Sequence, residues 1–180
     1  MPKDQKDLAK REYWKKFFEV DRFKDGFEWY ASFDDLKGYL KQHCKDKADG
    51  SALNIVVPGC GNSDLSEKIC RDLQLKKVSV ESFDYEEQVV ESMQSSKPAD
   101  LPLNYSLGDC TNLKPQYEDG KFDVAVDKGT FDALAVDDSE ETVKKIVDYY
   151  NNERLHSALG YQTPATWYRG NPDDISSARR

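Results

Sequence analysis

The segment of residues 54–63 constrains the fold most, because an apolar run leads directly into a turn that contains two glycines, Gly59 and Gly61. A helix is predicted from Asp64 onward. Glycine lets the backbone approach a ligand closely, and the N-terminus of a helix offers it free N–H groups. The pattern therefore predicts a strand, a tight turn and a helix at a ligand site. The same turn also occurs in α/β folds that bind nothing there, and this alternative stays open.

Three further strands are predicted, over residues 78–85, 103–107 and 122–126, and each ends in polar residues. Asp84 closes the second strand, Asp109 follows the third and Asp127 follows the fourth. Ligands of open α/β sheets bind outside the carboxyl ends of the strands, where an acid after the second strand can accept hydrogen bonds from ribose hydroxyls. We expect these termini to meet at one crevice. Taken singly, each carboxylate is equally well explained as a helix cap or a solvated loop residue.

The motifs on these elements resemble those of a known family, the class I S-adenosylmethionine-dependent methyltransferases. They are, in order, PGCGNSDLSEKI, SFDYEEQVVESM, LGDCTNL and FDVAVDKGTFDAL. More narrowly, they resemble the methyltransferase-like group that includes the lysine methyltransferases of elongation factor 1-alpha. That group has similar EYW and WY motifs before the first strand, here within residues 12–18 and 27–30. The likeness covers about residues 12–138 and implies a Rossmann-like α/β sheet, with S-adenosyl-L-methionine as cofactor.

The resemblance also implies a set of cofactor-binding residues. It places Trp14 and Trp29 against the cofactor, Gly59 with Gly61 in the turn under the methionine moiety, Asp84 with Tyr85 on the ribose and adenine, Asp109 and Cys110 beside the adenine, and Lys128 near the methionine end. For the two tryptophans there is an alternative, since Tyr13, Phe17 and Val20 share the spacing of an amphipathic helix that packs in the core.

One residue is the candidate for catalysis. Methyl transfer to an amine mainly requires alignment of donor and acceptor and exclusion of water. A lysine must also lose its proton, which a partly desolvated pocket favours. Asp127, at the mouth of the fourth strand, is predicted to orient the amine, with Lys128 and Gly129 holding the turn. The alternative for Asp127 is a carboxylate that caps the following helix.

A different resemblance begins near the end of the chain. Residues 148–169 contain YN, R, HSALGY and TP, and they are similar to the last segment of the integrase-type core of insertion-sequence transposases. We therefore expect a methyltransferase domain over 1–138, made of a helical segment (1–50) and a cofactor-binding half (51–138). Residues 139–180 are expected to form a helix and an integrase-like tail of foreign origin, with the junction between 138 and 147. A natural fusion, a transposon insertion and an assembly artefact would all produce such a chain.

The sheet is expected to be truncated after its fourth parallel strand and followed by a helical C-terminal tail. In the strand order three-two-one-four, this leaves Val124 and Val126 on an unpaired edge. An exposed apolar edge favours self-association.

Composition limits the partners. The net charge of −8 argues against a nucleic-acid surface and suits a basic protein partner. No apolar run approaches the length of a membrane span, and the N-terminus lacks the apolar core of a signal peptide, so a cytoplasmic protein is expected. The four cysteines have no metal-site spacing, so no metal is expected.

The leading prediction is an S-adenosylmethionine-dependent methyltransferase of the protein-lysine type, acting on a protein like elongation factor 1-alpha. Loss of activity through truncation is one alternative to it. A second is a non-catalytic cofactor-binding or interaction fragment from a gene fusion. A third is a transposase-related nucleic-acid-binding remnant, which rests on the tail alone.

Overall fold

The computed structural model describes residues 5–20 and 26–136 of the 180-residue chain. The chain divides into two units, residues 1–134 and 135–180. The described elements are, in chain order, η1 (Gln5–Ala9), α1 (Arg11–Phe18), α2 (Phe33–His43), β1 (Leu53–Pro58), α3 (Leu65–Asp72), β2 (Val78–Asp84), α4 (Glu87–Ser96), β3 (Leu103–Leu107), β4 (Val124–Ala125) and α5 (Thr130–Ala135). None of these helices is long and apolar enough to cross a membrane. The predicted junction at 138–147, the helix from residue 138 or 139 and the integrase-like tail lie outside the described residues.

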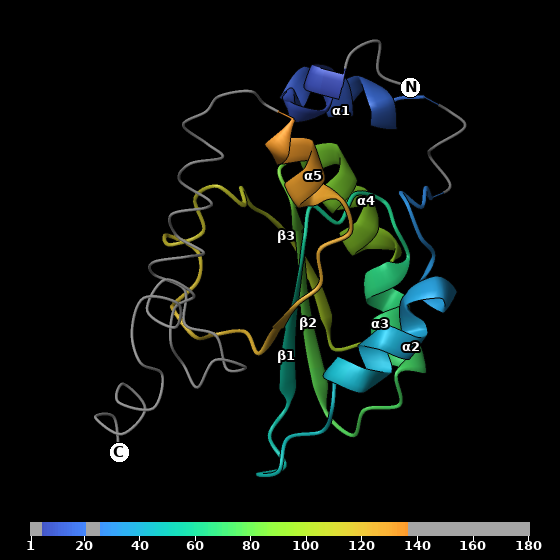
Figure 1. The fold of residues 1–180 in the computed structure, drawn as a ribbon, viewed down its shortest axis with the longest axis vertical. Coiled ribbons are helices and arrows are strands. Elements are labelled where there is room, and N and C mark those ends of the chain that lie inside the picture. The colour runs from blue at the N-terminus through green and yellow to red at the C-terminus, as the bar shows by residue number, and fades with distance from the viewer. Residues whose placement is uncertain (1–4, 21–25, 137–180) are drawn as a thin grey trace, which may run out of the picture. The chain divides into compact units, whose positions relative to one another are not determined.

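The four strands form one parallel sheet in the order β3-β2-β1-β4, which confirms the predicted order. In the central register, Ile55 of β1 lies between Val80 of β2 and Val124 of β4. Helices α1 and α5 lie at the carboxyl ends of the strands, whereas α2 and α3 lie alongside the sheet (Figure 1). A site at the carboxyl ends is therefore roofed by helices from both ends of the described chain.

The hydrophobic core lies on one face of the sheet. Ile55 and Val80 are paired on neighbouring strands. They belong to one core cluster with Leu40 of α2, Ile69 of α3 and Val90 of α4. Both strand residues and the α3 isoleucine are almost fully buried. Full burial of such a side chain contributes about 1.5–3 kcal/mol, so this layer fixes the sheet and the three helices as one body.

The opposite face of the sheet is polar at β2 and β3. Glu81 accepts hydrogen bonds from Asn104 Nδ2 at 3.0 Å, Ser106 Oγ at 2.6 Å and the Tyr117 hydroxyl at 3.0 Å. Parallel strands covered by helices on both faces usually read as continuous apolar runs. β1 has such a run, in Ile55, Val56 and Val57, whereas β2 and β3 place polar side chains on this face and the loop that carries Tyr117 hydrogen-bonds to them.

The β4 edge differs from the prediction in its side chains. Among the described residues, β4 pairs only with β1, and the Val126 N–H donates to Val56 O at 2.8 Å. The side chains of Val124 and Val126 pack against the core, so they do not form an exposed apolar rim. Self-association through this edge stays a prediction that rests on the backbone alone.

Candidate functional site

The turn after β1 has the predicted glycine geometry. Gly59 and Gly61 have φ values of 54° and 51°, in the left-handed region that glycine adopts without steric cost. A Cβ atom on Gly59 would lie 2.1 Å from Thr130 Oγ1, and one on Gly61 would lie 3.2 Å from Phe18 Cζ. The two glycines therefore allow α5 and α1 to close directly onto bare backbone.

Asp84 connects the end of β2 to this turn. Its Oδ2 accepts from the Gly61 N–H at 2.9 Å, and its Oδ1 accepts from the Glu86 N–H at 3.0 Å. Burial raises the pKa of the Asp84 carboxyl above its usual value, although the two N–H bonds act in the opposite direction. Since an ionised carboxylate offers about four lone-pair sites, it keeps acceptor capacity for a ligand.

Aromatic side chains roof the crevice. Trp14 of α1 and Trp29 stand edge-to-face, with ring centroids 5.6 Å apart, and the Trp14 indole N–H donates to Leu8 O at 2.6 Å. Phe17 is buried beneath both tryptophans. Trp14, Phe17 and Trp29 pack against one another, as the core-packing alternative predicted, and they also line the pocket, as the cofactor role requires.

Arg11 holds α1 over the end of β2. Its Nε donates to Glu86 Oε1 at 3.1 Å, and its Nη2 donates to Tyr85 O. The guanidinium carbon also lies 5.3 Å from the centroid of the Tyr85 ring. The first turn of α1 is therefore attached to the segment that carries Asp84.

Glu28 links three parts of the site, and the sequence reasoning did not identify it. Its carboxylate accepts from Lys128 Nζ at 2.7 Å, from Ser63 Oγ at 2.8 Å and from the Asp64 N–H at 3.1 Å. Lys128, only 10% exposed, donates in addition to Trp29 O at 3.2 Å. The only signal in the sequence was that Glu28 directly precedes the WY motif. A local sequence pattern does not predict a contact with a residue 100 positions away.

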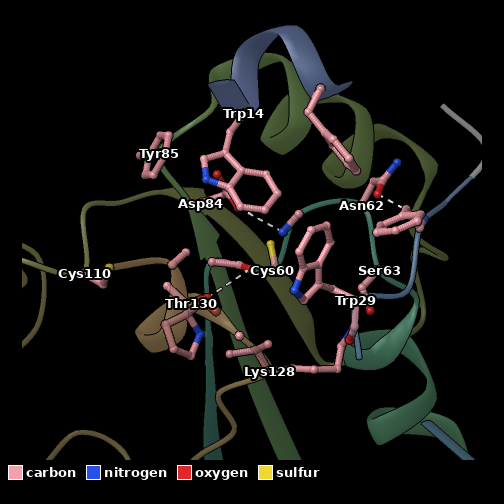
Figure 2. Close-up of a pocket in the computed structure, with 18 of the residues that line it drawn as sticks. Trp14, Trp29, Cys60, Asn62, Ser63, Asp84, Tyr85, Cys110, Lys128 and Thr130 are labelled. Carbon is pink, nitrogen blue, oxygen red and sulfur yellow. Dashed lines mark hydrogen bonds between the residues drawn. The ribbon is translucent and has the colours of Figure 1, made fainter. Parts of the chain in front are cut away.

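One pocket collects most of the predicted binding residues. Figure 2 shows Trp14 above it, Tyr85 and Cys110 on one side, and Asn62 and Ser63 on the other. The predicted residues that line it are Trp14, Trp29, Gly59, Gly61, Asp84, Tyr85, Cys110 and Lys128. Thr130 also lines it and donates from Oγ1 to Pro58 O at 2.9 Å.

Asp109 and Asp127 do not line this pocket. Asp109 is exposed, and its Oδ1 accepts from the N–H and the hydroxyl of Thr111 at 2.8 and 2.7 Å. Asp127 is also exposed, and its Oδ1 accepts from the N–H groups of Thr130 and Phe131 at 3.2 and 3.3 Å. The geometry of Asp127 is that of a helix cap, the alternative reading of this residue, because a short side chain one turn before α5 reaches its free N–H groups.

Thiol and metal chemistry find no support in the described part of the chain. Burial raises the pKa of the Cys110 thiol to about 11 and that of Cys60 well above its ordinary value. Both side chains are therefore thiols at neutral pH, whereas the thiolate is the nucleophile. No cluster of three histidine, cysteine or acidic side chains suited to a metal ion occurs within residues 5–20 and 26–136.

Known proteins similar in sequence to this chain include methyltransferases. The chain is 31% identical over 147 residues to the eEF1A lysine and N-terminal methyltransferase of Bos taurus, which is 81% of this chain and 20% of that protein. It is 33% identical over 160 residues to the homologue from Drosophila pseudoobscura pseudoobscura, 87% of this chain and 22% of that protein. The chain is related to the class I S-adenosylmethionine-dependent methyltransferases. It spans about a fifth of the length of these relatives.

Two further similarities accompany these methyltransferase relatives. Residues 128–164 match the integrase core domain family, which agrees with the resemblance of the tail and extends it back to Lys128. Among solved structures, the plantazolicin methyltransferase BpumL in complex with SAH is 16% identical, with 81% of this chain and 53% of that chain covered and a TM-score of 0.44.

Proposed function

We propose that this pocket binds S-adenosyl-L-methionine and that the chain transfers its methyl group to an amine of a protein. One observation carries the proposal: a buried carboxylate at the end of β2, Asp84, lies 2.9 Å from the N–H of a left-handed glycine, Gly61. Hydroxyls of a ribose need a carboxylate acceptor in this position of an α/β sheet, and bare backbone lets the rest of the ligand approach.

The residues present fit the cofactor in charge and in shape. Asp84 offers acceptors for ribose hydroxyls, and Tyr85 with Cys110 offers apolar surface for a base. At the other end of the pocket, Lys128 brings a cation toward a carboxylate, since its ammonium has three donors and two are used by Glu28 and Trp29 O. When bound, the cofactor would supply an electrophilic methyl group on a sulfonium.

The chain itself would contribute alignment and exclusion of water. The aromatic layer of Trp14, Phe17 and Trp29 shields the pocket from solvent. The acceptor ammonium would lose its proton to solvent before it reacts; the neutral nitrogen would then bond to the methyl carbon while the carbon–sulfur bond breaks. Holding the reacting atoms in line at near-contact distance supplies much of the rate enhancement in such a displacement.

We further propose a lysine or N-terminal amine of a protein as acceptor, because the relatives named above are eEF1A lysine and N-terminal methyltransferases. The net charge of −8 favours a basic partner such as an elongation factor 1-alpha-like protein, and a cytoplasmic location is consistent with it. Asp127 remains the candidate for orienting the amine. Its Oδ1 caps α5, so Oδ2 is the atom that would take this role.

The test is calorimetric titration of the purified chain with S-adenosylhomocysteine. Asp84→Ala is expected to abolish most of the binding, whereas Asp72→Ala, which changes an exposed acid at the end of α3 outside the pocket, should leave it intact. Far-UV circular dichroism of both variants shows whether each is folded. A folded wild-type chain that does not bind, or equal losses in the two variants, would contradict the proposal.

A non-catalytic cofactor-binding protein is the second candidate, because binding requires the pocket alone. Transfer of a labelled methyl group to recombinant elongation factor 1-alpha separates the two candidates. Label on the factor that Asp84→Ala prevents supports the enzyme, and binding without label supports the binding protein.

We also propose that residues 1–138 and 139–180 have separate origins, which sequencing the transcript across codons 138–147 tests.

A further inference from the structure

Tyr30 holds a strained backbone conformation next to the pocket. Its φ is 65°, and the Ala31 N–H donates to Trp29 O across it at 2.8 Å. A three-residue turn with a positive central φ is rare and strained, above all for a bulky residue. Such strain persists only where surrounding contacts fix it, and it clusters at ligand and active sites.

Contacts from the β4 side fix this turn. Lys128 Nζ donates to the same carbonyl, Trp29 O, at 3.2 Å, and is held in turn by Glu28. The Tyr30 ring lies against Gly129, where a Cβ atom would come 2.8 Å from its Cε2. The ring also stands at 87° to that of Trp29, with the centroids 5.8 Å apart. Four residues therefore define where the Tyr30 ring points.

Burial does not explain this arrangement, because Tyr30 is 71% exposed. The residues that surround it, Trp29, Lys128 and Gly129, all line the pocket. The ring is thus a rigid, solvent-facing aromatic surface on the rim of the pocket, on the β4 side. It adjoins Lys128, the residue proposed to meet the methionine end, which donates to the carbonyl of the preceding residue, Trp29.

We propose that Tyr30 is the acceptor-positioning residue of the site: the alkylammonium arm of the substrate amine packs along its exposed ring on the way to the methyl group. The assignment rests on the proposed function. An aromatic face attracts an ammonium and offers apolar surface to the methylenes behind it. Because the backbone is already fixed, little conformational entropy is lost when the arm binds, which is the advantage that offsets the strain.

The test needs neither turnover nor a known protein substrate. The probe is an analogue of S-adenosylhomocysteine in which nitrogen replaces sulfur and carries a four-carbon arm ending in a primary ammonium. Its dissociation constant is compared with that of S-adenosylhomocysteine by calorimetry for each variant. Wild type should bind the armed probe more tightly, and Tyr30→Ala should reduce this advantage about three- to thirtyfold while S-adenosylhomocysteine affinity stays unchanged.

Three variants make the outcome decisive. Tyr30→Gly removes the ring but keeps the turn, because glycine adopts a positive φ freely. It should therefore behave like Tyr30→Ala if the ring is what binds the arm. Tyr30→Phe should keep the wild-type ratio. Tyr39→Ala removes a tyrosine of similar exposure, 69%, from α2 outside the pocket and should change nothing.

The results also separate the two proposals. An unchanged ratio in Tyr30→Ala and Tyr30→Gly, or an equal loss in Tyr39→Ala, overturns the role of Tyr30 and leaves the proposed function intact. A folded wild-type chain that binds neither compound overturns both.

Discussion

A single methyl group added at Gly59 should destabilise the protein more than the same change at Gly50 or Gly61, two other left-handed glycines. Gly59 has a φ of 54°, and the added Cβ of alanine would lie 2.1 Å from Thr130 Oγ1 and 2.7 Å from its Cγ2. Thr130 cannot simply rotate away, because its hydroxyl donates to Pro58 O at 2.9 Å. Gly59→Ala must therefore displace the first turn of α5 from the turn after β1.

The expected cost is a sum of three effects. A left-handed φ costs an alanine about 1–2 kcal/mol, of which roughly 0.4–1 kcal/mol is offset because alanine also restricts the unfolded chain. Overpacking against Thr130 adds about 1–3 kcal/mol. Loss of the hydroxyl bond to Pro58 O adds about 1 kcal/mol. Gly59→Ala should thus lower the free energy of unfolding by about 2–6 kcal/mol, a large part of the stability of a small domain.

Two other glycines separate these contributions. Gly50 has a φ of 72° with nothing within 4 Å of the built Cβ, so Gly50→Ala reports the backbone strain alone. Gly61 has nearly the same φ as Gly59 but would meet only the end of the Phe18 ring, at 3.2 Å, and Gly61→Ala should fall between the two. Urea unfolding followed by far-UV circular dichroism measures all three. Equal losses in Gly59→Ala and Gly50→Ala would refute the packing of Thr130 against the turn.

Three further perturbations test the site. Glu28→Gln removes the charge that pairs with a largely buried lysine, so the free energy of unfolding should fall by about 1–3 kcal/mol. Glu67→Gln, in a more exposed helical ion pair with Arg71, should cost less than about 0.5 kcal/mol, and urea unfolding compares the two. Because burial raises the pKa of Asp84, its contribution to stability without ligand is fully present below the ordinary aspartate pKa and is lost as pH rises through the raised value. Ribose hydroxyls favour the ionised form, so S-adenosylhomocysteine affinity should instead rise with pH over the same window and release protons, and a flat calorimetric profile would contradict this. Arg11→Ala should weaken S-adenosylhomocysteine binding about three- to tenfold by freeing α1 from the end of β2, whereas Lys15→Ala on the same helix should bind like wild type.

The fold was accessible from the sequence because its signals are local. The apolar runs at β1, β2 and β3, and the left-handed glycines that follow β1, determine their own conformation, and parallel strands then bring their carboxyl ends together. This reasoning placed Asp84, Gly59 and Gly61 at one site, where the structure has them. Trp14 and Trp29 also line this pocket, but they were predicted there only from the family resemblance and not from the spacing of residues in the sequence.

The remainder depends on contacts that no local pattern encodes. Glu28 and Lys128 meet across 100 residues because the loop before α2 returns to the end of β4. The exposed carboxylates Asp109 and Asp127 resemble Asp84 in sequence, and all three accept from an N–H group two to four residues ahead. Only Asp84 also accepts from the distant Gly61 N–H and lines the pocket. Short acids after strands satisfy either a ligand or a helix end, and only the three-dimensional path of the chain decides which.

The shortness of β4 has a consequence for local unfolding. Beyond its two paired residues, β4 is attached to β1 by the Val126 N–H on Val56 O and by two hydrogen bonds between Asn54 and Asp123. Because these bonds are few, they can break while the rest of the sheet stays folded, and this opening would carry Lys128 away from the pocket. A ligand that bridges β1, β2 and β4 therefore binds only the closed state, and at a hundred times its dissociation constant it stabilises that state by about 2.7 kcal/mol. Amide exchange at Val126 would then slow by about a hundredfold, which makes this one amide a reporter of pocket occupancy.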